Sequence, residues 1–292
     1  MGVEARIWRS ELLGEQRELA LPQGRVQYFA RGHGPALVFA HGWLANANLW
    51  RTVVDRLADR FTCVTLDLPF GSHRVPMDPE ADLSPDGVGE LLAAILAALG
   101  LRDVTLVGND SGGAYSQIAA ATHPERVARL VLNSCETPYD EWPPPPFDGL
   151  PALVQDPEML KNAFGLLKDP ELRWTDAAFG LVIKHRAEDL VMESYCLPVL
   201  HDDGIVEDTR KVMSSTTAAP VHAAARRLIA EFEKPVLFAW PSEDRVFPIE
   251  HARRYAEQLA DARVEPIDDA YSFTPEDNPD ALAAAIAAAR PL

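Results

Sequence analysis

One short segment near the middle of the chain combines a carboxylate with closely spaced glycines. The segment reads Gly108-Asn109-Asp110-Ser111-Gly112-Gly113, and it follows directly on the continuously apolar run Val104–Val107. A glycine on each side of a central residue permits a strand-to-helix turn too tight for side chains, with the central residue held in a strained conformation. Asp110 is that residue, because centring the turn on Ser111 would require a glycine at position 109. The turn would place the aspartate beside a helix N-terminus, whose N–H groups favour negative charge.

A carboxylate presented in this way could act as a nucleophile. An ionised aspartate needs no base to attack an epoxide carbon or an alkyl halide, but the ester so formed must be hydrolysed. That second step requires a positioned base that activates water. A glycine-rich turn with Asp110 as a helix N-cap is the simpler interpretation of the segment alone. A second motif, His41-Gly42-Trp43 directly after the apolar run Ala36–Ala40, favours the catalytic turn, a nucleophile elbow.

The elements around these motifs alternate between strands and helices. Apolar runs predict strands at Arg25–Phe29, Ala36–Ala40, Cys63–Leu68, Val104–Val107, Leu130–Asn133, Pro235–Trp240 and Val264–Ile267. Helical periodicity covers Trp50–Leu57, Gly89–Leu99, Ser111–His123, Glu250–Leu259 and a final alanine-rich stretch. This alternation implies right-handed crossovers and a mainly parallel sheet, which binds ligands at the carboxyl ends of its strands.

The alternation stops between Glu136 and about Glu233. The segment begins rich in proline, at Pro143–Pro146, and continues with helical periods and no clear strand. We predict a helical cap over residues 136–233, inserted into an α/β core formed by residues 1–135 and 234–292. The aromatic side chains of the cap should cover an apolar pocket, although most of them serve as cap core.

Taken together, the motifs resemble the α/β-hydrolase superfamily over nearly the whole chain. The matching segments are His41-Gly42-Trp43, Asp67-Leu68-Pro69, the segment 108–113, His123-Pro124-Glu125-Arg126-Val127, and Ser242-Glu243-Asp244 with Val246 and Pro248. The resemblance implies an α/β-hydrolase fold, a mainly parallel sheet flanked by helices with an inserted helical cap. An aspartate at the elbow is similar to the epoxide hydrolase and haloalkane dehalogenase branches. The resemblance also implies an oxyanion hole from the backbone N–H groups of Trp43 and Ser111, and it places Asp244 at the acid position. A loop aspartate that caps the following helix is the alternative for Asp244.

The histidine of this family is missing from its usual place. In the family it follows the last strand, commonly as Gly-His-Phe, and Phe273 matches that phenylalanine, so Ser272 stands at the histidine position. A serine cannot activate water near neutral pH. Glu136, shortly after the strand Leu130–Asn133, is a better-placed acid or base, with an N-cap of the cap's first segment as the alternative.

Other polar side chains are candidates for contact with a substrate. We assign His41, Tyr139, Trp142, Tyr195 and Ser272 to this group. In the family the histidine at position 41 is structural, and a packing role is the alternative for Tyr195, which could protonate a leaving oxygen. His185 and His201 lie in the predicted cap, where a solvent-facing role is the simpler interpretation.

Diagnostic positions weaken the two nearest branches. Haloalkane dehalogenases carry a tryptophan just after the nucleophile, where this chain has Ser111, so dehalogenation is disfavoured. Epoxide hydrolases usually have His-Gly-x-Pro, where this chain has Leu44.

Three functions therefore remain, and we rank them. We predict an enzyme that uses Asp110 on a medium-sized apolar small molecule, nominally a hydrolase similar to epoxide hydrolases. A non-hydrolytic acid/base enzyme, catalysing an elimination, cyclisation or rearrangement, is the alternative, because one proton transfer needs no histidine. A catalytically silent binding protein ranks last, since an elbow and Asp244 exceed what binding requires.

Composition excludes several other classes. The formal net charge of −17 over 292 residues argues against nucleic acid and anionic membrane surfaces. Three widely spaced cysteines fit neither a disulfide framework nor a metal site, and they indicate free thiols in the cytoplasm. The glycine order lacks the Gly-x-Gly-x-x-Gly of a dinucleotide site, so we expect no metal and no organic cofactor. A small molecule is the expected partner, and a homodimer is compatible with the sequence.

Overall fold

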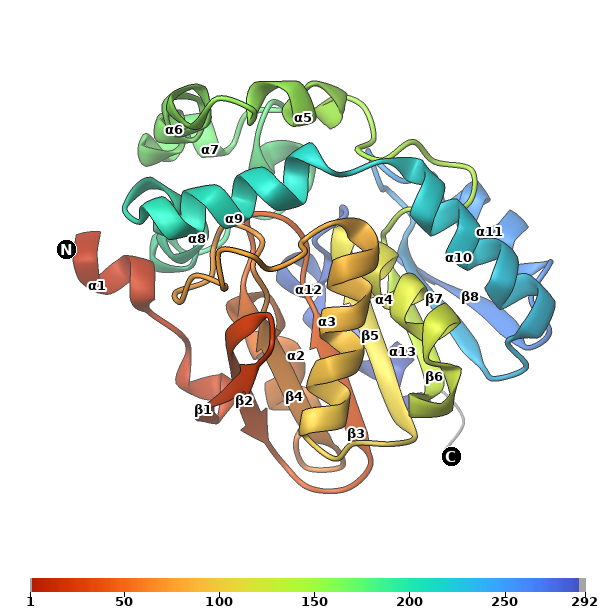
Figure 1. Cartoon of the computed structure of the whole chain (residues 1–292). Helices are drawn as coiled ribbons and strands as arrows, with labels where there is room; N and C mark the ends of the chain where they lie inside the picture. Colours follow the sequence, from red (N-terminus) through yellow and green to blue (C-terminus); the bar gives the residue numbers. More distant parts are fainter. Residues whose placement is uncertain (1, 289–292) are drawn as a thin grey trace.

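The sheet is mainly parallel, as predicted. The computed structural model describes residues 2–288, and within them eight strands form one sheet in the order β1-β2-β4-β3-β5-β6-β7-β8 (Figure 1). The strands are β1 Glu15–Leu21, β2 Gly24–Arg31, β3 Ala36–Ala40, β4 Thr62–Asp67, β5 Val104–Asn109, β6 Val127–Asn133, β7 Val236–Pro241 and β8 Ala262–Ile267. β2 pairs antiparallel with both β1 and β4, and all other pairs are parallel.

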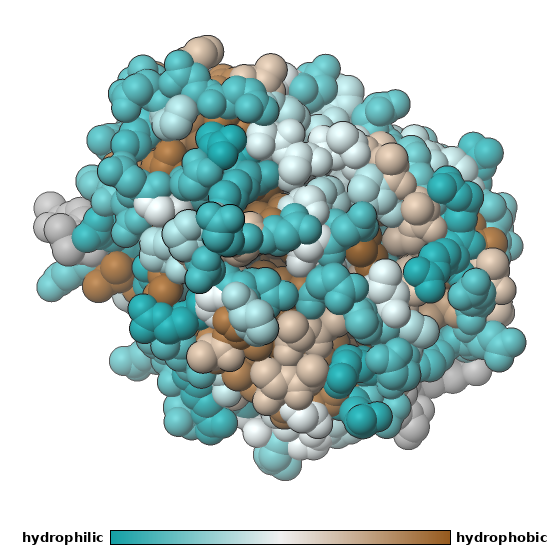
Figure 2. All heavy atoms as spheres, viewed as in Figure 1, coloured by the Kyte–Doolittle hydropathy of each residue, from teal (hydrophilic) through white to brown (hydrophobic). Residues whose placement is uncertain are grey.

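Helices cover both faces of the sheet. In one hydrophobic core, buried side chains of the strands pack with buried side chains of four helices. These helices are α3 Pro85–Ala98, α4 Ser111–Thr122, α10 Ala218–Glu231 and α11 Ile249–Ala256. A second core holds those of α2 Arg51–Leu57 and α13 Pro279–Ala288. Two further short helices are α1 Gly2–Ile7 and α12 Thr274–Asp277. Most of the molecular face seen in Figure 2 is hydrophilic, with hydrophobic residues showing in smaller areas between polar ones.

A layer of short helices lies above the sheet in Figure 1. It comprises α5 Leu150–Leu153, α6 Pro157–Gly165, α7 Pro170–Arg173, α8 Asp189–Cys196 and α9 Asp203–Ser214. Seven 3-10 turns complete the description: η1 Glu11–Leu13, η2 Ala47–Trp50, η3 Pro124–Arg126, η4 Phe147–Gly149, η5 Leu166–Lys168, η6 Phe179–Leu181 and η7 Pro198–Leu200. We call residues 147–214 the cap layer.

Helix α10 lies inside the range 136–233 that we predicted as the cap, yet it packs on the flank of the sheet. It contacts α4, and Val221, Ala224 and Leu228 belong to the same core as the strands. The physical reason is that these side chains recur at helical spacing on one face, which is buried against α4. The layer over the site is therefore shorter than the predicted cap.

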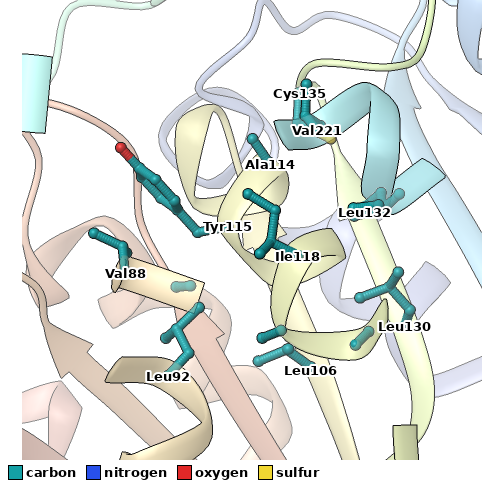
Figure 3. Packing of buried hydrophobic residues seen from close by; sticks show 14 of the residues in the cluster. Val88, Leu92, Leu106, Ala114, Tyr115, Ile118, Leu130, Leu132, Cys135 and Val221 are labelled. Atoms are coloured by element: carbon teal, nitrogen blue, oxygen red, sulfur yellow. The ribbon is translucent and has the colours of Figure 1, made fainter. Parts of the chain in front are cut away.

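Close packing between α3 and α4 sets the position of the elbow. Figure 3 shows Val88 and Leu92 of α3 facing α4 and β5, with Ile118 of α4 between them and Leu130 of β6. Gly89 makes this approach possible, because a Cβ there would lie 2.5 Å from a methyl carbon of Ile118. Since α4 begins at the elbow, its packing fixes the turn at its N-terminus.

No helix of the described residues is long and apolar enough to cross a membrane.

Candidate active site

Asp110 occupies a strained turn between β5 and α4. Its backbone has φ 53° and ψ −142°, a conformation that non-glycine residues rarely adopt. Two hydrogen bonds hold it: the Asp110 N–H donates to the Ser134 carbonyl at 2.8 Å, and the Gly113 N–H donates to the Asp110 carbonyl at 2.7 Å. A Cβ at Gly112 would lie 2.4 Å from the His41 carbonyl oxygen, so the turn requires that glycine. The segment adopts the geometry of a nucleophile elbow.

The carboxylate of Asp110 lies against the backbone of the predicted oxyanion hole. The Trp43 N–H donates to Asp110 Oδ2 at 3.2 Å and lies 3.1 Å from Ser111 Oγ. The backbone N–H groups of Ser111 and Trp43 both lower the pKa of the carboxyl group. Gly42 leaves room for this contact, since a Cβ at that position would lie 2.0 Å from Asp110 Oδ2. The two predicted backbone donors therefore act on one carboxylate.

His41 holds the loop that carries Trp43. Its Nδ1 lies 2.8 Å from the Gly42 carbonyl oxygen, and its Nε2 accepts from the Leu68 N–H at 2.9 Å. Burial lowers the pKa of His41 to about 4, so the ring stays neutral. We predicted His41 as a substrate-binding residue; both of its ring nitrogens instead bond to the backbone beneath the site.

Asp244 is saturated with hydrogen bonds. Its Oδ1 accepts from the Val246 and Phe247 N–H groups, each at 2.9 Å, and from Ser272 Oγ at 2.8 Å. Its Oδ2 accepts from Ser134 Oγ at 2.5 Å. Burial raises the pKa of Asp244, and these bonds act in the opposite direction. Ser272 thus takes the place that the family gives to histidine, and the aspartate links the loops after β6, β7 and β8.

Ser272 has no access to a substrate. The residue is fully buried, its hydroxyl bonds to Asp244, and its carbonyl accepts from Asn109 Nδ2 at 2.8 Å. We predicted that Ser272 binds substrate; the structure gives it a role in holding the elbow, because the residue before Asp110 bonds directly to it.

Glu136 lies in the loop after β6 and reaches the same cavity as Asp110. The residue is 1% exposed, and its Oε2 has no hydrogen-bond partner among the described residues. Its backbone is anchored by Gln117 Nε2, which donates to the Glu136 carbonyl at 2.8 Å. Burial raises the pKa of Glu136 well above its ordinary value, and the charge of Asp110 raises it further. Burial and a negative charge on Asp110 therefore both favour the protonated form of Glu136.

Burial also raises the pKa of Asp110, to about 7, and the charge of Asp244 adds to this effect. The pKa of each carboxyl group in the cavity is therefore raised, and ionisation of Asp110 opposes ionisation of Glu136.

An apolar cavity of about 310 Å³ lies between the elbow and the cap layer. Its polar lining consists of Asp110, Ser111 and Glu136, together with the indole rings of Trp43 and Trp142. The remaining lining residues are aliphatic, aromatic or proline: Leu44, Pro143, Pro144, Phe147, Leu150, Leu153, Ala163, Phe164, Leu166, Leu167, Ala177, Ala178, Phe179, Val182, Met213 and Phe273. No lysine, arginine or histidine of the part of the chain that the structure describes lines this cavity. The site accordingly suits an uncharged, largely apolar molecule.

The predicted substrate-binding aromatic residues divide into one that lines the cavity and two that do not. Trp142 lines it, is 4% exposed, and has an Nε1 without a partner among the described residues. Tyr195 is fully buried, and its hydroxyl donates to Glu276 Oε1 at 2.7 Å. Tyr139 instead lies beside α11, with the Arg254 guanidinium 4.0 Å from the centre of its ring. Neither tyrosine is placed to protonate a leaving group in the cavity.

His185 and His201, two histidines of the predicted cap, are not among the residues that line the cavity. His185 Nε2 lies 3.0 Å from Asp269 Oδ1, with half of its side chain exposed, and His201 is exposed. Ser134 is a site residue that was not predicted from the sequence: its hydroxyl donates to Asp244, and its carbonyl oxygen accepts from the Asp110 N–H. Its place directly after β6 is the signal that could have identified it. Among the described residues no cluster of histidine, cysteine and carboxylate side chains could hold a metal ion.

Comparison with known proteins agrees with this architecture. The sequence model described as "alpha/beta hydrolase fold" matches residues 35–166, a range that includes the elbow. A carboxylesterase from Bacillus subtilis has a similar structure, with a TM-score of 0.75 and 16% identity over 98% of this chain and 93% of that chain. The haloalkane dehalogenase from Bradyrhizobium elkani USDA94 gives a TM-score of 0.75 and 19% identity, over 94% and 96% of the two chains.

The chain has the α/β-hydrolase fold, and residues 35–166 match the model of that family. The recognition of the superfamily and the fold class, both predicted from sequence, are confirmed. A pimeloyl-acyl-carrier-protein methyl ester esterase from Aeromonas hydrophila subsp. hydrophila is 36% identical to this chain over 116 residues. That match covers 38% of this chain and 43% of the esterase, so the chain spans less than half the length of that relative.

Proposed function

We propose that this α/β-hydrolase is an enzyme that forms an ester on Asp110 and then hydrolyses it. One observation supports the proposal. The partly buried carboxylate of Asp110 lies at the elbow in an apolar cavity, and its Oδ2 accepts a hydrogen bond from the Trp43 N–H. In such an attack one carboxylate oxygen bonds to the substrate carbon, and the other stays in the oxyanion hole. When water adds to the ester carbonyl, negative charge develops on that second oxygen, where backbone donors are typically worth about 3–4 kcal/mol each.

The substrate class follows from the lining of the cavity. An uncharged electrophile with an apolar body fits best, and an epoxide is the simplest example, so the proposed activity is similar to that of epoxide hydrolases. The volume of 310 Å³ lies at the lower end of the range of about 300–1,000 Å³ typical of small-molecule pockets, which favours a small to medium-sized molecule.

A second candidate is a non-hydrolytic acid/base reaction in the same cavity. The observation that favours it is that the Ser272 hydroxyl donates a hydrogen bond to Asp244. At the position of Ser272, a hydrolase of this fold would use a histidine to activate water. Asp110 would then remove a proton and Glu136 would supply one, in an elimination, cyclisation or rearrangement.

Single turnover in H₂¹⁸O separates the two candidates. Excess enzyme is incubated with styrene oxide and trans-stilbene oxide, and both the product and the peptide containing Asp110 are analysed by mass spectrometry. The proposal expects one ¹⁸O in the Asp110 peptide, because water attacks the ester carbonyl. It also expects unlabelled diol in the first turnover, and no product from Asp110→Asn.

Two results would overturn the proposal. Labelled diol with an unlabelled Asp110 peptide would show that water attacks the epoxide directly. An unlabelled product that is an isomer of the substrate, with an unlabelled peptide, would favour the second candidate.

A further inference from the structure

We infer that Glu136 performs both proton transfers of the reaction, as general acid in the first step and as general base in the second. This inference rests on the proposed function and deepens it, because it names the group that replaces the absent histidine. The observations that carry it are that Glu136 lines the same cavity as Asp110, is 1% exposed, and has an unpartnered Oε2.

A structural role does not account for this carboxyl group. Burying an oxygen without a hydrogen-bond partner costs free energy, and a hydrophobic side chain of similar size would avoid that cost. Two other hydrogen bonds, each of 2.8 Å, already hold the backbone of this loop. Gln117 Nε2 donates to the Glu136 carbonyl oxygen, and the Thr137 N–H donates to Asp140 Oδ2. A buried acid with one unpartnered oxygen in an apolar cavity therefore indicates a ligand or a reacting group.

No other residue that lines the cavity can take this role. Among the described residues 2–288, Glu136 is the one lining residue with a carboxyl group apart from Asp110, and none of them contributes an imidazole or an amine to the lining. Ser111 has a hydroxyl, which is too weak a base near neutral pH. Asp244 has both oxygens occupied by hydrogen bonds and does not line the cavity.

The cycle balances with two carboxyl groups and one water molecule. In the first step an oxygen of ionised Asp110 bonds to an epoxide carbon as the C–O bond of the ring breaks. The ring oxygen keeps the electron pair and takes the proton of Glu136, which leaves an Asp110 ester and an ionised Glu136. In the second step Glu136 removes a proton from water, and the water oxygen adds to the ester carbonyl carbon of Asp110. Collapse breaks the bond to the product oxygen, which takes the second water proton, so that Asp110 is ionised and Glu136 protonated again.

The charges in the cavity favour this alternation. While Asp110 is ionised, burial and the neighbouring negative charge hold the pKa of Glu136 high, so Glu136 carries the proton. Formation of the ester neutralises Asp110, and this removes the like charge that opposed ionisation of Glu136. The pKa of Glu136 then falls at the step in which it must act as a base.

Glu136→Gln tests the inference, because the amide keeps the shape of the side chain but cannot transfer the proton. We expect the Asp110 ester to form slowly from styrene oxide and to persist, with hydrolysis at least about 100-fold slower than in the wild type. With benzyl bromide, whose bromide leaves without a proton, the ester should form at close to the wild-type rate and still persist. Glu136→Asp should restore part of the turnover, and Glu141→Gln, an exposed carboxylate of the same loop, should leave turnover unchanged.

The outcomes separate this inference from the proposed function. If wild-type enzyme incorporates ¹⁸O into Asp110 but Glu136→Gln turns over within about threefold of it, the inference is wrong and the proposed function stands. If the wild type never labels Asp110, the proposed function itself is wrong. Near-ultraviolet circular dichroism of Glu136→Gln verifies that the variant folds, and a folded variant without an adduct from either reagent would also contradict the inference.

Discussion

Replacement of Asp110 by asparagine should stabilise the folded protein, and the gain should grow between pH 5 and pH 8. Burial raises the pKa of Asp110 from an ordinary 3.8 to about 7, so the folded state holds the proton more tightly than the unfolded chain. Below about pH 4 both states are protonated and Asp110 costs nothing. As the pH rises from about 4 to 7, the unfolded chain loses the Asp110 proton while the folded site keeps it, so the free energy of unfolding falls progressively. Above about pH 7 both states are ionised and the loss is constant.

The magnitude follows from the difference between the two pKa values. At 1.36 kcal/mol for each pKa unit, the full cost of ionisation is about 4 kcal/mol, of which roughly a third is already present at pH 5. Asp110 is only partly buried, which reduces the effect, so we expect the advantage of the asparagine variant to grow by about 2 kcal/mol from pH 5 to pH 8. Asparagine retains an oxygen that accepts from the Trp43 N–H, so the oxyanion-hole contact survives.

Urea unfolding at pH 5, 6, 7 and 8 measures this effect. The free energy of unfolding is compared between the wild type, Asp110→Asn and Asp59→Asn, an exposed aspartate used as the control. The control should show no pH-dependent gain. A stability gain for Asp110→Asn that is the same at pH 5 and pH 8 would refute the reasoning, because it would mean that folding does not raise the affinity of Asp110 for its proton.

Three further predictions concern other parts of the site. Gly42→Ala places a methyl group against Asp110 Oδ2, because a Cβ there would lie 2.0 Å from that oxygen. The kcat/KM for an epoxide should therefore fall at least about 100-fold, with an unchanged circular dichroism spectrum. Activity within tenfold of the wild type would contradict this geometry. Glu276→Gln removes the charged partner of the largely buried Arg51, 2.6 Å away, and should destabilise folding by about 3–5 kcal/mol in urea; a loss below about 1 kcal/mol would mean that the pair is screened. Trp142→Phe removes the unpartnered indole N–H but keeps an aromatic ring. The KM should therefore rise about tenfold for epoxides that carry an ether or carbonyl oxygen and stay unchanged for hydrocarbon epoxides. Equal changes in KM for both kinds of epoxide would exclude a hydrogen-bonding role of the indole.

Sequence patterns located most of the fold because they report local physics. The apolar run Ala36–Ala40 coincides with β3, and Val104–Val107 lies within β5, since strands buried on both faces read as continuous apolar segments. Strand β1 was overlooked because most of its residues are exposed and carry no alternating pattern. The helical range 136–233 could not be divided by pattern alone, because α10 has the same kind of apolar face as a cap helix and only its contact with α4 assigns it to the sheet.

The candidate site shows the same division. The elbow at Asp110 could be read from two glycines and a strand, and the loss of histidine at Ser272 from one phenylalanine. The contacts of Tyr139 and Tyr195 could not be predicted from the sequence. Their partners, Gln258 and Glu276, lie far away in the chain and meet them only after folding.

The sequence by itself therefore determined the superfamily, the strained turn and the identity of its aspartate, because turn sterics and strand periodicity depend on neighbouring residues. Only the tertiary structure decided that Asp244 is saturated and that Glu136 shares an apolar cavity with Asp110. Burial and the repulsion between two carboxyl groups depend on side chains brought together from distant segments. The raised pKa values of Asp110 and Glu136 are therefore properties of the folded site, because they arise from burial and from charges on distant segments.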